Sequence, residues 1–235
     1  NTNKVIEWLG GTNSAYFVVD NTGRLYYEGG GNAWNGGSTI STGQWVHVAL
    51  VHDGYGSNNV KTYLNGNLNW TATLSDLTSN TSTKIGTNFE GAIDDFRYWN
   101  AALTQTQINE RLNIRLEGNE TNLLRYYTMD HGKAGLNNVG LTSVKDKTSN
   151  NAHGTLDGLA LTGSTSNWVI GRTYPILYQD ADADGYGSTT TWSCGSMSGF
   201  QSNSYDCNDN NAAIKPVANE TCGNGVDENC NGVTD

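Results

Sequence analysis

The sequence predicts an all-β protein, an antiparallel β-sandwich of the jelly-roll type with one short helix, followed by a small loop-rich segment. Among its 235 residues are 29 Gly and a 10% share of aromatics, arranged as many short apolar runs with turn signals between them. A charged fraction of only 15% suits an extracellular β-module better than a cytosolic enzyme. Near residues 171–175 this pattern gives way to acidic loops. We therefore expect two domains, residues 1–172 and 173–235.

The expected strands follow from short β-rich runs bounded by turn residues. Residues 45–51 (WVHVALV) form a continuous apolar run, so both faces of this strand should be covered. Asn65-Gly66 is the strongest short hairpin signal in the chain. The expected strands are residues 15–19, 24–27, 45–51, 60–64, 68–70, 84–86, 91–99, 123–127, 154–156 and 167–170.

One helix is expected directly after the strand that ends at residue 99. Thr104 and Gln107 have the spacing of a capping box, and Ile108 and Leu112 lie four residues apart on one face.

The net charge of −10 and the pI near 4.7 exclude nucleic acid and anionic membrane surfaces as partners, because binding there depends on clustered Lys and Arg. No apolar run is long enough for membrane insertion. The first residues lack the basic-then-apolar pattern of a signal peptide. We expect a mature fragment whose partners include the remainder of a larger parent chain.

All four cysteines fall in the last segment, which indicates two disulfides and an oxidising compartment. The pairs Cys194–Cys207 and Cys222–Cys230 give the shortest loops, although the sequence leaves three pairings open. A zinc site is the alternative, but the Cys-x-x-Cys spacing and a nearby His are missing.

An acidic loop begins at Asp180 and has the spacing of a calcium site. Asp180, Asp182 and Asp184 stand at positions one, three and five, Gly185 provides the turn, and the Tyr186 carbonyl stands at position seven. Oxygen ligands at alternate positions let a short chain fold around one hard cation, so we expect Ca²⁺ as the cofactor.

This loop is not an EF-hand, because Thr191 stands at position twelve, where a bidentate Glu would be required. It must therefore take oxygens from elsewhere in the segment. Asp206 and Asp209 are the expected donors, brought close by a Cys194–Cys207 bridge.

A second loop repeats the spacing with fewer charges. Its candidate ligands are Asp227, Asn229, Asn231, the Val233 carbonyl and Asp235. The alternative interpretation is an acidic solvated linker. Neighbouring carboxylates without a cation would repel one another, however, and the segment has too few apolar residues to fold alone. Cations and disulfides would supply that stability, and an oxygen-only ligand set argues against copper.

Residues 1–170 resemble the laminin-G-like domains of the concanavalin-A-like lectin/glucanase superfamily. The motifs that carry the resemblance are WVHVA (45–49), YLNG (63–66), IG (85–86) and FEGAIDDFRYWN (89–100) followed by ALT. The first strands of that family, with their Phe-Asp-Gly signature, are not found, so we expect an incomplete sandwich or one closed by other parts of the parent chain. Residues 123–168 resemble a unit that often accompanies such domains in large bacterial surface proteins.

Residues 178–235 resemble the metal-binding repeat of secreted bacterial proteins (MopE-type), which is related to thrombospondin type 3 loops. The matching motifs are YQDADADGYG (178–187), DCND (206–209), Pro216, ETC (220–222) and GVDENCNG (225–232). Asn208 and Asn231 replace carboxylates that are common in this family, which lowers the charge around the ions.

Catalysis is not expected. Glycoside hydrolases of the superfamily use Glu-x-Asp-x-x-Glu on one strand, and the stretch from Glu90 to Asp94 and Asp95 lacks that register. His47 lies in an apolar strand and is expected to pack in the core. The sequence shows no Ser-His-Asp, Cys-His or His-Glu-x-x-His arrangement.

Ligand contacts on the sandwich are open to two interpretations each. Asp94 would hold a structural calcium at the rim, or would bond turn amides instead. Trp34, Tyr55 and Trp70 lie in or beside polar loops and would stack on sugar rings, or would simply pack.

The function expected from these features is a non-catalytic, secreted or cell-surface module that binds an extracellular polysaccharide or surface glycan, as an adhesin does, with calcium-stabilised loops. Two alternatives remain: a structural stalk or spacer without a ligand of its own, and an ancillary carbohydrate-binding module of a polysaccharide-degrading enzyme.

Overall fold

The computed structural model describes residues 3–9, 15–20, 22–29, 32–54, 59–73, 82–171, 176–192, 199–201 and 203–234. Antiparallel strands dominate them, with one α-helix, so the predicted fold class is confirmed. The chain divides into two compact units. Unit 1 comprises Asn1–Leu112 and Leu116–Arg172, and unit 2 comprises Asn113–Arg115 and Thr173–Asp235.

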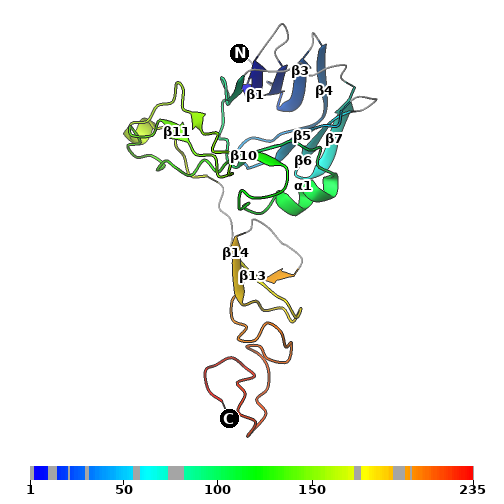
Figure 1. Cartoon of the computed structure of the whole chain (residues 1–235), viewed down its shortest axis with the longest axis vertical. Coiled ribbons are helices and arrows are strands. Elements are labelled where there is room, and N and C mark those ends of the chain that lie inside the picture. Colours follow the sequence, from blue (N-terminus) through cyan, green and yellow to red (C-terminus); the bar gives the residue numbers. More distant parts are fainter. Residues whose placement is uncertain are drawn as a thin grey trace. The chain divides into compact units, whose positions relative to one another are not determined.

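The larger sheet of unit 1 has five antiparallel strands in the order β4-β3-β2-β1-β8 (Figure 1). Strand β1 pairs with both β2 and β8, which joins the beginning of the chain to a strand almost eighty positions later. The strands are β1 (Asn3–Leu9), β2 (Ala15–Val19), β3 (Arg24–Gly29), β4 (Asn32–Thr39) and β8 (Ser82–Ile85).

The second sheet of unit 1 consists of β5 (Val48–His52), β6 (Val60–Leu64) and β7 (Asn67–Ala72), in that order. The predicted hairpin is present: β6 and β7 pair across Asn65 and Gly66, both of which have positive φ angles (47° and 78°). A second feature favours glycine at position 66. A Cβ there would overlap the Asn109 side-chain oxygen of the helix, so that side chain would have to move.

The core lies between these two sheets. Buried side chains of the five-stranded sheet, Ala15 and Tyr27, pack against Val60 and Ala72 of the three-stranded sheet. Burial raises the pKa of Tyr27 to about 12. This face-to-face contact makes the unit a sandwich.

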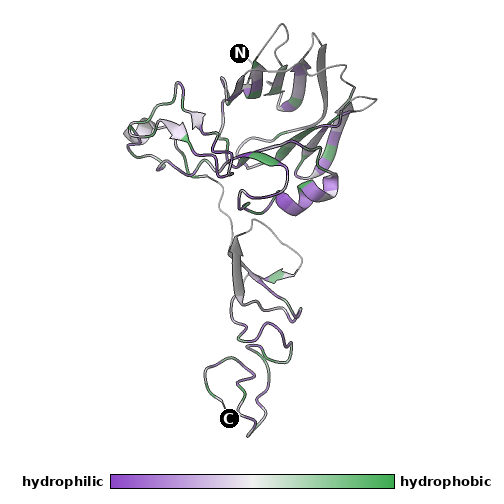
Figure 2. Cartoon of the chain, viewed as in Figure 1, coloured by the Kyte–Doolittle hydropathy of each residue, from purple (hydrophilic) through white to green (hydrophobic). Residues whose placement is uncertain are grey.

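The other face of the three-stranded sheet is covered by helix α1 (Gln105–Arg111), where Ile108 packs with Val51 and Tyr63. Both halves of the predicted capping box form, because Thr104 and Gln107 each accept the other's backbone N–H. The rest of the helix is hydrophilic, as its colour in Figure 2 shows, and Ile108 is its buried residue.

The remainder of unit 1 contains short elements: β9 (Phe96–Trp99), β10 (Leu123–Tyr127), β11 (Ser143–Val144), β12 (Gly154–Thr155) and the 3₁₀ turn η1 (Gly163–Thr165). Strand β9 pairs with β10, and Phe96 stacks on Tyr127 with ring centroids 5.7 Å apart. Tyr126 is fully buried beside Asp146, which accepts its backbone N–H.

Unit 2 begins with a small sheet in the order β14-β13-β15, formed by β13 (Ile176–Gln179), β14 (Thr189–Trp192) and β15 (Phe200–Gln201). Acidic loops occupy most of the rest. Among its described residues, Ile214 is the buried hydrophobic side chain, whereas Asp180, Asp206, Asp209 and Glu228 are buried and charged.

Three sequence predictions of secondary structure need correction. The strand expected at 45–51 begins only at Val48, and Trp45 is 40% exposed, although Leu50 and Val51 do pack on opposite faces. Residues 167–170 form no strand, and Ile170 is 80% exposed. Residues 91–95 are loop, because the positive φ of Asp95 (57°) interrupts the extended chain before β9.

The part of the chain that the structure describes contains no helix with the length and apolar character of a membrane span.

Candidate metal centre

The carboxylates of the first acidic loop meet those of a later segment, and together they form two overlapping groups. Asp180, Asp182 and Asp209 each offer one oxygen within 4.8 Å of the others, and so do Asp182, Asp184 and Asp206. Cation–oxygen bonds of about 2.3–2.6 Å suit such separations between ligand atoms. The structure thus brings together five predicted ligands, including both donors from outside the loop.

The first loop takes its shape from hydrogen bonds to Asp180. Its two carboxylate oxygens accept the backbone N–H groups of Asp184 (3.0 Å) and Gly185 (3.1 Å), and Asp184 accepts that of Tyr186 (2.9 Å). Ala183 adopts a left-handed conformation with φ of 64°, which costs energy for a residue with a Cβ. This turn directs the side chains of Asp182 and Asp184 to one side of the backbone.

Asp206 and Asp209 reach the loop through hydrogen bonds of their own. The N–H of Ala181 donates to Asp209 (2.9 Å), and the N–H of Asp206 donates to the Gly187 carbonyl (3.3 Å). Asp206 and Asp209 are 5% and 9% exposed, so both carboxylates are withdrawn from water.

Several oxygens of this centre are buried without a hydrogen-bond partner. They are both carboxylate oxygens of Asp182, one of Asp184 and one of Asp206. Burying an ionised carboxylate without a partner is costly, and native proteins usually pair such groups or use them to bind a metal. The donor set consists of oxygens, which fits a hard divalent cation.

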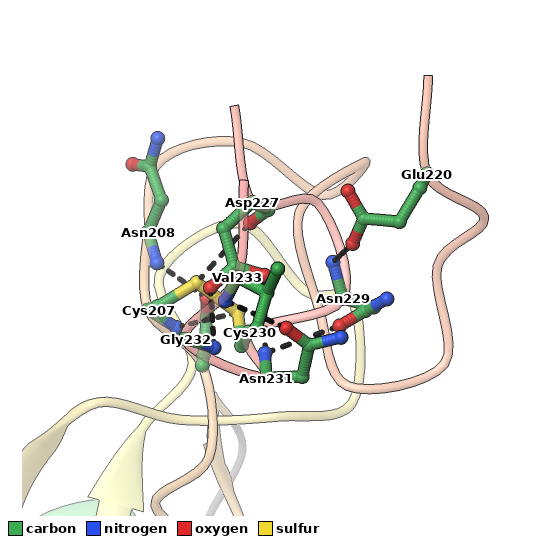
Figure 3. Close-up of a disulfide and its surroundings, with 10 residues drawn as sticks. Cys207, Asn208, Glu220, Asp227, Asn229, Cys230, Asn231, Gly232 and Val233 are labelled. Atoms are coloured by element: carbon green, nitrogen blue, oxygen red, sulfur yellow. Dashed lines mark hydrogen bonds between the residues drawn. A yellow bond between two sulfur atoms is a disulfide. The ribbon is translucent and has the colours of Figure 1, made fainter. Parts of the chain in front are cut away.

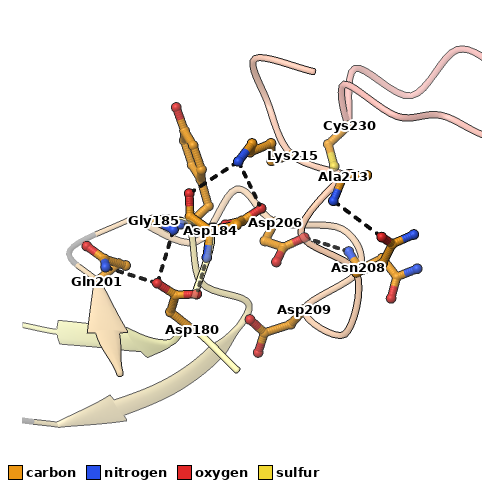
Figure 4. A network of polar contacts seen from close by, with 12 residues as sticks. Asp180, Asp184, Gly185, Gln201, Asp206, Asn208, Asp209, Ala213, Lys215 and Cys230 are labelled. Carbon is orange, nitrogen blue, oxygen red and sulfur yellow. Dashed lines mark hydrogen bonds and ion pairs between the residues drawn. The ribbon is translucent and has the colours of Figure 1, made fainter. Parts of the chain in front are cut away.

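Two carboxyl groups of the centre have pKa values shifted in opposite directions. Burial raises the pKa of Asp180, but hydrogen bonds from Gln201 and from the Gly185 and Asp184 amides outweigh it, so the pKa lies below its ordinary value (Figure 4). Burial and the neighbouring Asp184, Asp182 and Asp209 charges raise the pKa of Asp206, although the Asn208 N–H opposes them. Asp206 is therefore disfavoured as a charged group both by its burial and by the neighbouring carboxylates.

The second loop repeats the backbone geometry of the first. Asp227 accepts the N–H groups of Asn231 (3.0 Å) and Gly232 (2.7 Å), and Asn231 accepts that of Val233 (2.7 Å) (Figure 3). Cys230 occupies the left-handed position with φ of 57°. Position by position, these are the bonds that Asp180 and Asp184 accept in the first loop.

The second loop differs in its charge. Asn229 and Asn231 stand where the first loop has Asp182 and Asp184, and both acidic groups of metal-binding size in the described residues lie at the first loop. Asp235 lies outside the described residues. Glu220, which sequence reasoning missed, accepts the N–H of Asn229 (2.9 Å), and its second oxygen is buried without a partner (Figure 3).

The predicted disulfide pairing is wrong. Cys207 is bonded to Cys230, with their Cα atoms 5.6 Å apart, and Cys222 is an exposed free thiol. Cys194 lies outside the described residues. Choosing the shortest loops considered only distance along the chain, whereas Lys215 donates its N–H to the Glu228 carbonyl (2.8 Å) and so draws the two segments together. The bond joins the Asp206–Asp209 segment to the second loop.

The predicted ligand contacts on the sandwich receive less support from the structure than the carboxylates of unit 2 do. Trp70 is half-buried and packs against the core between the sheets, so its ring is not a free stacking platform. The side chain of Trp34 and the whole of Tyr55 lie outside the described part. Asp94 belongs to neither carboxylate group of the described residues and lies beside Gly171, so a cation there stays a prediction. Its neighbour Asp95 forms an ion pair with Arg97 (2.6 Å).

The fold and the site together define a chain of two parts, a β-sandwich and an acidic-loop segment. Residues 1–109 match the family model of the concanavalin A-like lectin/glucanases superfamily. Residues 206–235 match a second model, described as a "putative metal-binding motif". Both predicted resemblances are confirmed over these residues. No curated protein and no solved structure matches the chain.

The loop that begins at Asp180 lies outside the matched metal-binding residues. Its link to that motif comes from the structure, which places Asp206 and Asp209 of the motif against it.

Proposed function

We propose that the chain is a non-catalytic module of a secreted or cell-surface protein, in which residues 173–235 bind Ca²⁺ as a structural ion. The observation that supports this most strongly is the convergence of five aspartates, three of which (Asp182, Asp184 and Asp206) have buried oxygens without a hydrogen-bond partner. Such a segment gains its stability from the cation, because binding couples to folding. The disulfide favours an oxidising, extracellular compartment.

Calcium fits this centre better than other common metals. It takes six to eight oxygen ligands in flexible geometry, whereas Mg²⁺ requires a stricter octahedron and retains several waters. Zinc and copper prefer sulfur or imidazole ligands, and the candidate groups contain carboxylates alone. The five aspartates would hold the ion or ions, and the Tyr186 carbonyl is a further donor of the loop.

For the sandwich we propose binding of a glycan or another extracellular polymer, as in an adhesin. The match to a superfamily that includes lectins supports this, as does the acidic, weakly charged composition. The core position of Trp70 argues that the binding surface lies elsewhere on the unit. The stalk interpretation therefore remains the second candidate.

The experiment has two arms on the same purified chain. Isothermal titration with Ca²⁺, Mg²⁺, Zn²⁺ and Cu²⁺ should give the highest affinity for Ca²⁺, and Asp182→Asn should weaken it while Asp157→Asn, exposed in unit 1, should not. A polysaccharide panel is then tested in calcium and in chelator. Failure to bind calcium contradicts the metal proposal, and failure to bind any polymer favours the stalk.

A further inference from the structure

The acidic segment contains a single basic side chain, and that side chain lies at the carboxylate cluster. Residues 173–235 include nine Asp and Glu residues and no Arg or Lys except Lys215. The ammonium of Lys215 lies 3.5 Å from the Asp184 carbonyl oxygen and 3.9 Å from its carboxylate (Figure 4). The segment's one positive side chain thus sits where its negative charges are densest.

The position of Lys215 is fixed by its backbone. Its N–H donates to the Glu228 carbonyl (2.8 Å), and its carbonyl accepts the N–H of Ala218 (2.8 Å). The preceding residue, Ile214, is the buried apolar residue of the described part of unit 2. The backbone that carries this side chain is therefore well bonded, which keeps the Lys215 ammonium within reach of Asp184.

Asp184 needs a positive neighbour more than an ordinary surface carboxylate does. Its side chain has no exposed surface, and one of its oxygens has no hydrogen-bond partner. That residue also belongs to the Asp182–Asp184–Asp206 group. The ammonium and a divalent cation would therefore be attracted by the same oxygens.

We propose that Lys215 is a resident cation of this cluster, which stabilises the cation-free segment and lowers the affinity of the Asp182–Asp184–Asp206 group for a divalent ion. Five carboxylates and one ammonium leave four negative charges, which two divalent cations would neutralise. A lysine placed in this way reduces the repulsion that would otherwise disrupt the segment before the ion binds. It also raises the concentration of divalent cation at which this group becomes occupied. The inference rests on the proposed calcium function.

The test compares Lys215→Gln, Lys215→Arg and the control Lys145→Gln, which removes an exposed charge from unit 1. Calorimetric titration with CaCl₂ should show Lys215→Gln binding about tenfold more tightly than wild type. Lys215→Arg, which keeps the charge, and Lys145→Gln should bind as wild type does. In chelator, Lys215→Gln should melt at a lower temperature, so calcium raises its melting temperature by more than that of wild type.

The outcomes separate this inference from the calcium proposal. If wild type binds calcium and Lys215→Gln binds equally or more weakly while folded, Lys215 is not a competing cation and the inference is overturned. If neither chain binds calcium, the proposed function fails and the inference fails with it. If Lys215→Gln does not fold in chelator, its stability in saturating calcium decides: wild-type stability or more supports the inference, and less overturns it.

Discussion

The two units of this chain bury opposite kinds of side chain. In unit 1 the largest fully buried residues are Tyr27, Tyr126, Phe17 and Leu25, and apolar clusters fill the space between the sheets and beneath the helix. In unit 2 the buried residues are mainly acidic, and Ile214 is the apolar exception among the described residues. Unit 1 therefore packs around apolar side chains, and the described part of unit 2 packs mainly around carboxylate groups.

The contrast shows where each unit obtains its stability. Burial of apolar surface accounts for the stability of unit 1 without any ligand, since side chains of both sheets form its core. Unit 2 has no comparable core in its described residues, so under the proposed function the cost in chain entropy is offset by the disulfide and by a bound ion. The units should therefore respond differently to solution chemistry, which each of the following experiments tests.

The largest difference is expected from removing divalent cations. Chelation should abolish protection in residues 176–234 while leaving residues 3–171 unchanged, because the unpartnered aspartates then repel one another. A cation at about one thousand times its dissociation constant adds about 4.1 kcal/mol of stability. Peptide-level hydrogen exchange in CaCl₂ and in chelator measures both units in one sample.

A matched pair of variants controls for general effects. Asp182→Asn should reduce the calcium-dependent protection of unit 2, and Asp157→Asn should not. Equal exchange of residues 176–234 with and without chelator would show that the acidic loops are ordered without an ion.

The next largest effect is expected from the disulfide. Replacing both Cys207 and Cys230 by Ser should destabilise unit 2 by about 3 kcal/mol, the value for a loop of this length. Unit 1 should keep its stability, and Cys222→Ser should change neither unit, since Cys222 is an exposed free thiol. Denaturant titration in saturating calcium, with hydrogen exchange as the readout for each unit, measures the effect. A loss of stability in Cys222→Ser comparable to that of the double variant would contradict the assigned pairing.

The fold was predictable where the signal is local. The hairpin at Asn65-Gly66 and the capping box at Thr104 depend on residues a few positions apart, and both form as predicted. Strands β1 and β4 were missed because their sequences, NKVIEWL and NAWNGGST, are mixed or polar. Their pairing with distant strands makes them extended, and a single sequence does not reveal such partners.

The residues of the candidate metal centre were predictable from the sequence, but the contacts that connect its segments were not. Spacing identified the loop at Asp180, and Asp206 and Asp209 were expected as outside donors because of a Cys194–Cys207 bridge. The structure brings these aspartates together although Cys207 pairs with Cys230. The disulfide and Lys215 were not found, because both depend on how the two loops fold against each other. A lone lysine among nine acidic residues was the available signal for the latter.

The smallest effect is expected at Asp146, a buried carboxylate of unit 1. Its oxygens accept hydrogen bonds, in contrast to the unpartnered oxygens of unit 2. It accepts the N–H groups of Tyr126, Thr148 and Ala152, each at 3.0 Å, and the Thr148 hydroxyl at 2.9 Å. Burial raises the pKa of Asp146, but these hydrogen bonds outweigh it and hold the pKa below its ordinary value. The oxygens of Asp146 thus differ from those of Asp182, which are both buried without a hydrogen-bond partner.

Asp146→Asn should destabilise unit 1 by about 2 kcal/mol at neutral pH, because a neutral amide accepts hydrogen bonds more weakly and offers one acceptor fewer. Since the folded-state pKa is lowered, the stabilisation by Asp146 is complete above the unfolded pKa of about 3.9 and is lost as the pH falls through the folded pKa. Urea unfolding of unit 1 from pH 7 to pH 3 should therefore show wild type and variant converging in acid. The difference should be the same in calcium and in chelator. A calcium-dependent difference would mean that the ion also stabilises the sandwich, and the division into an apolar and a cation-dependent unit would not hold.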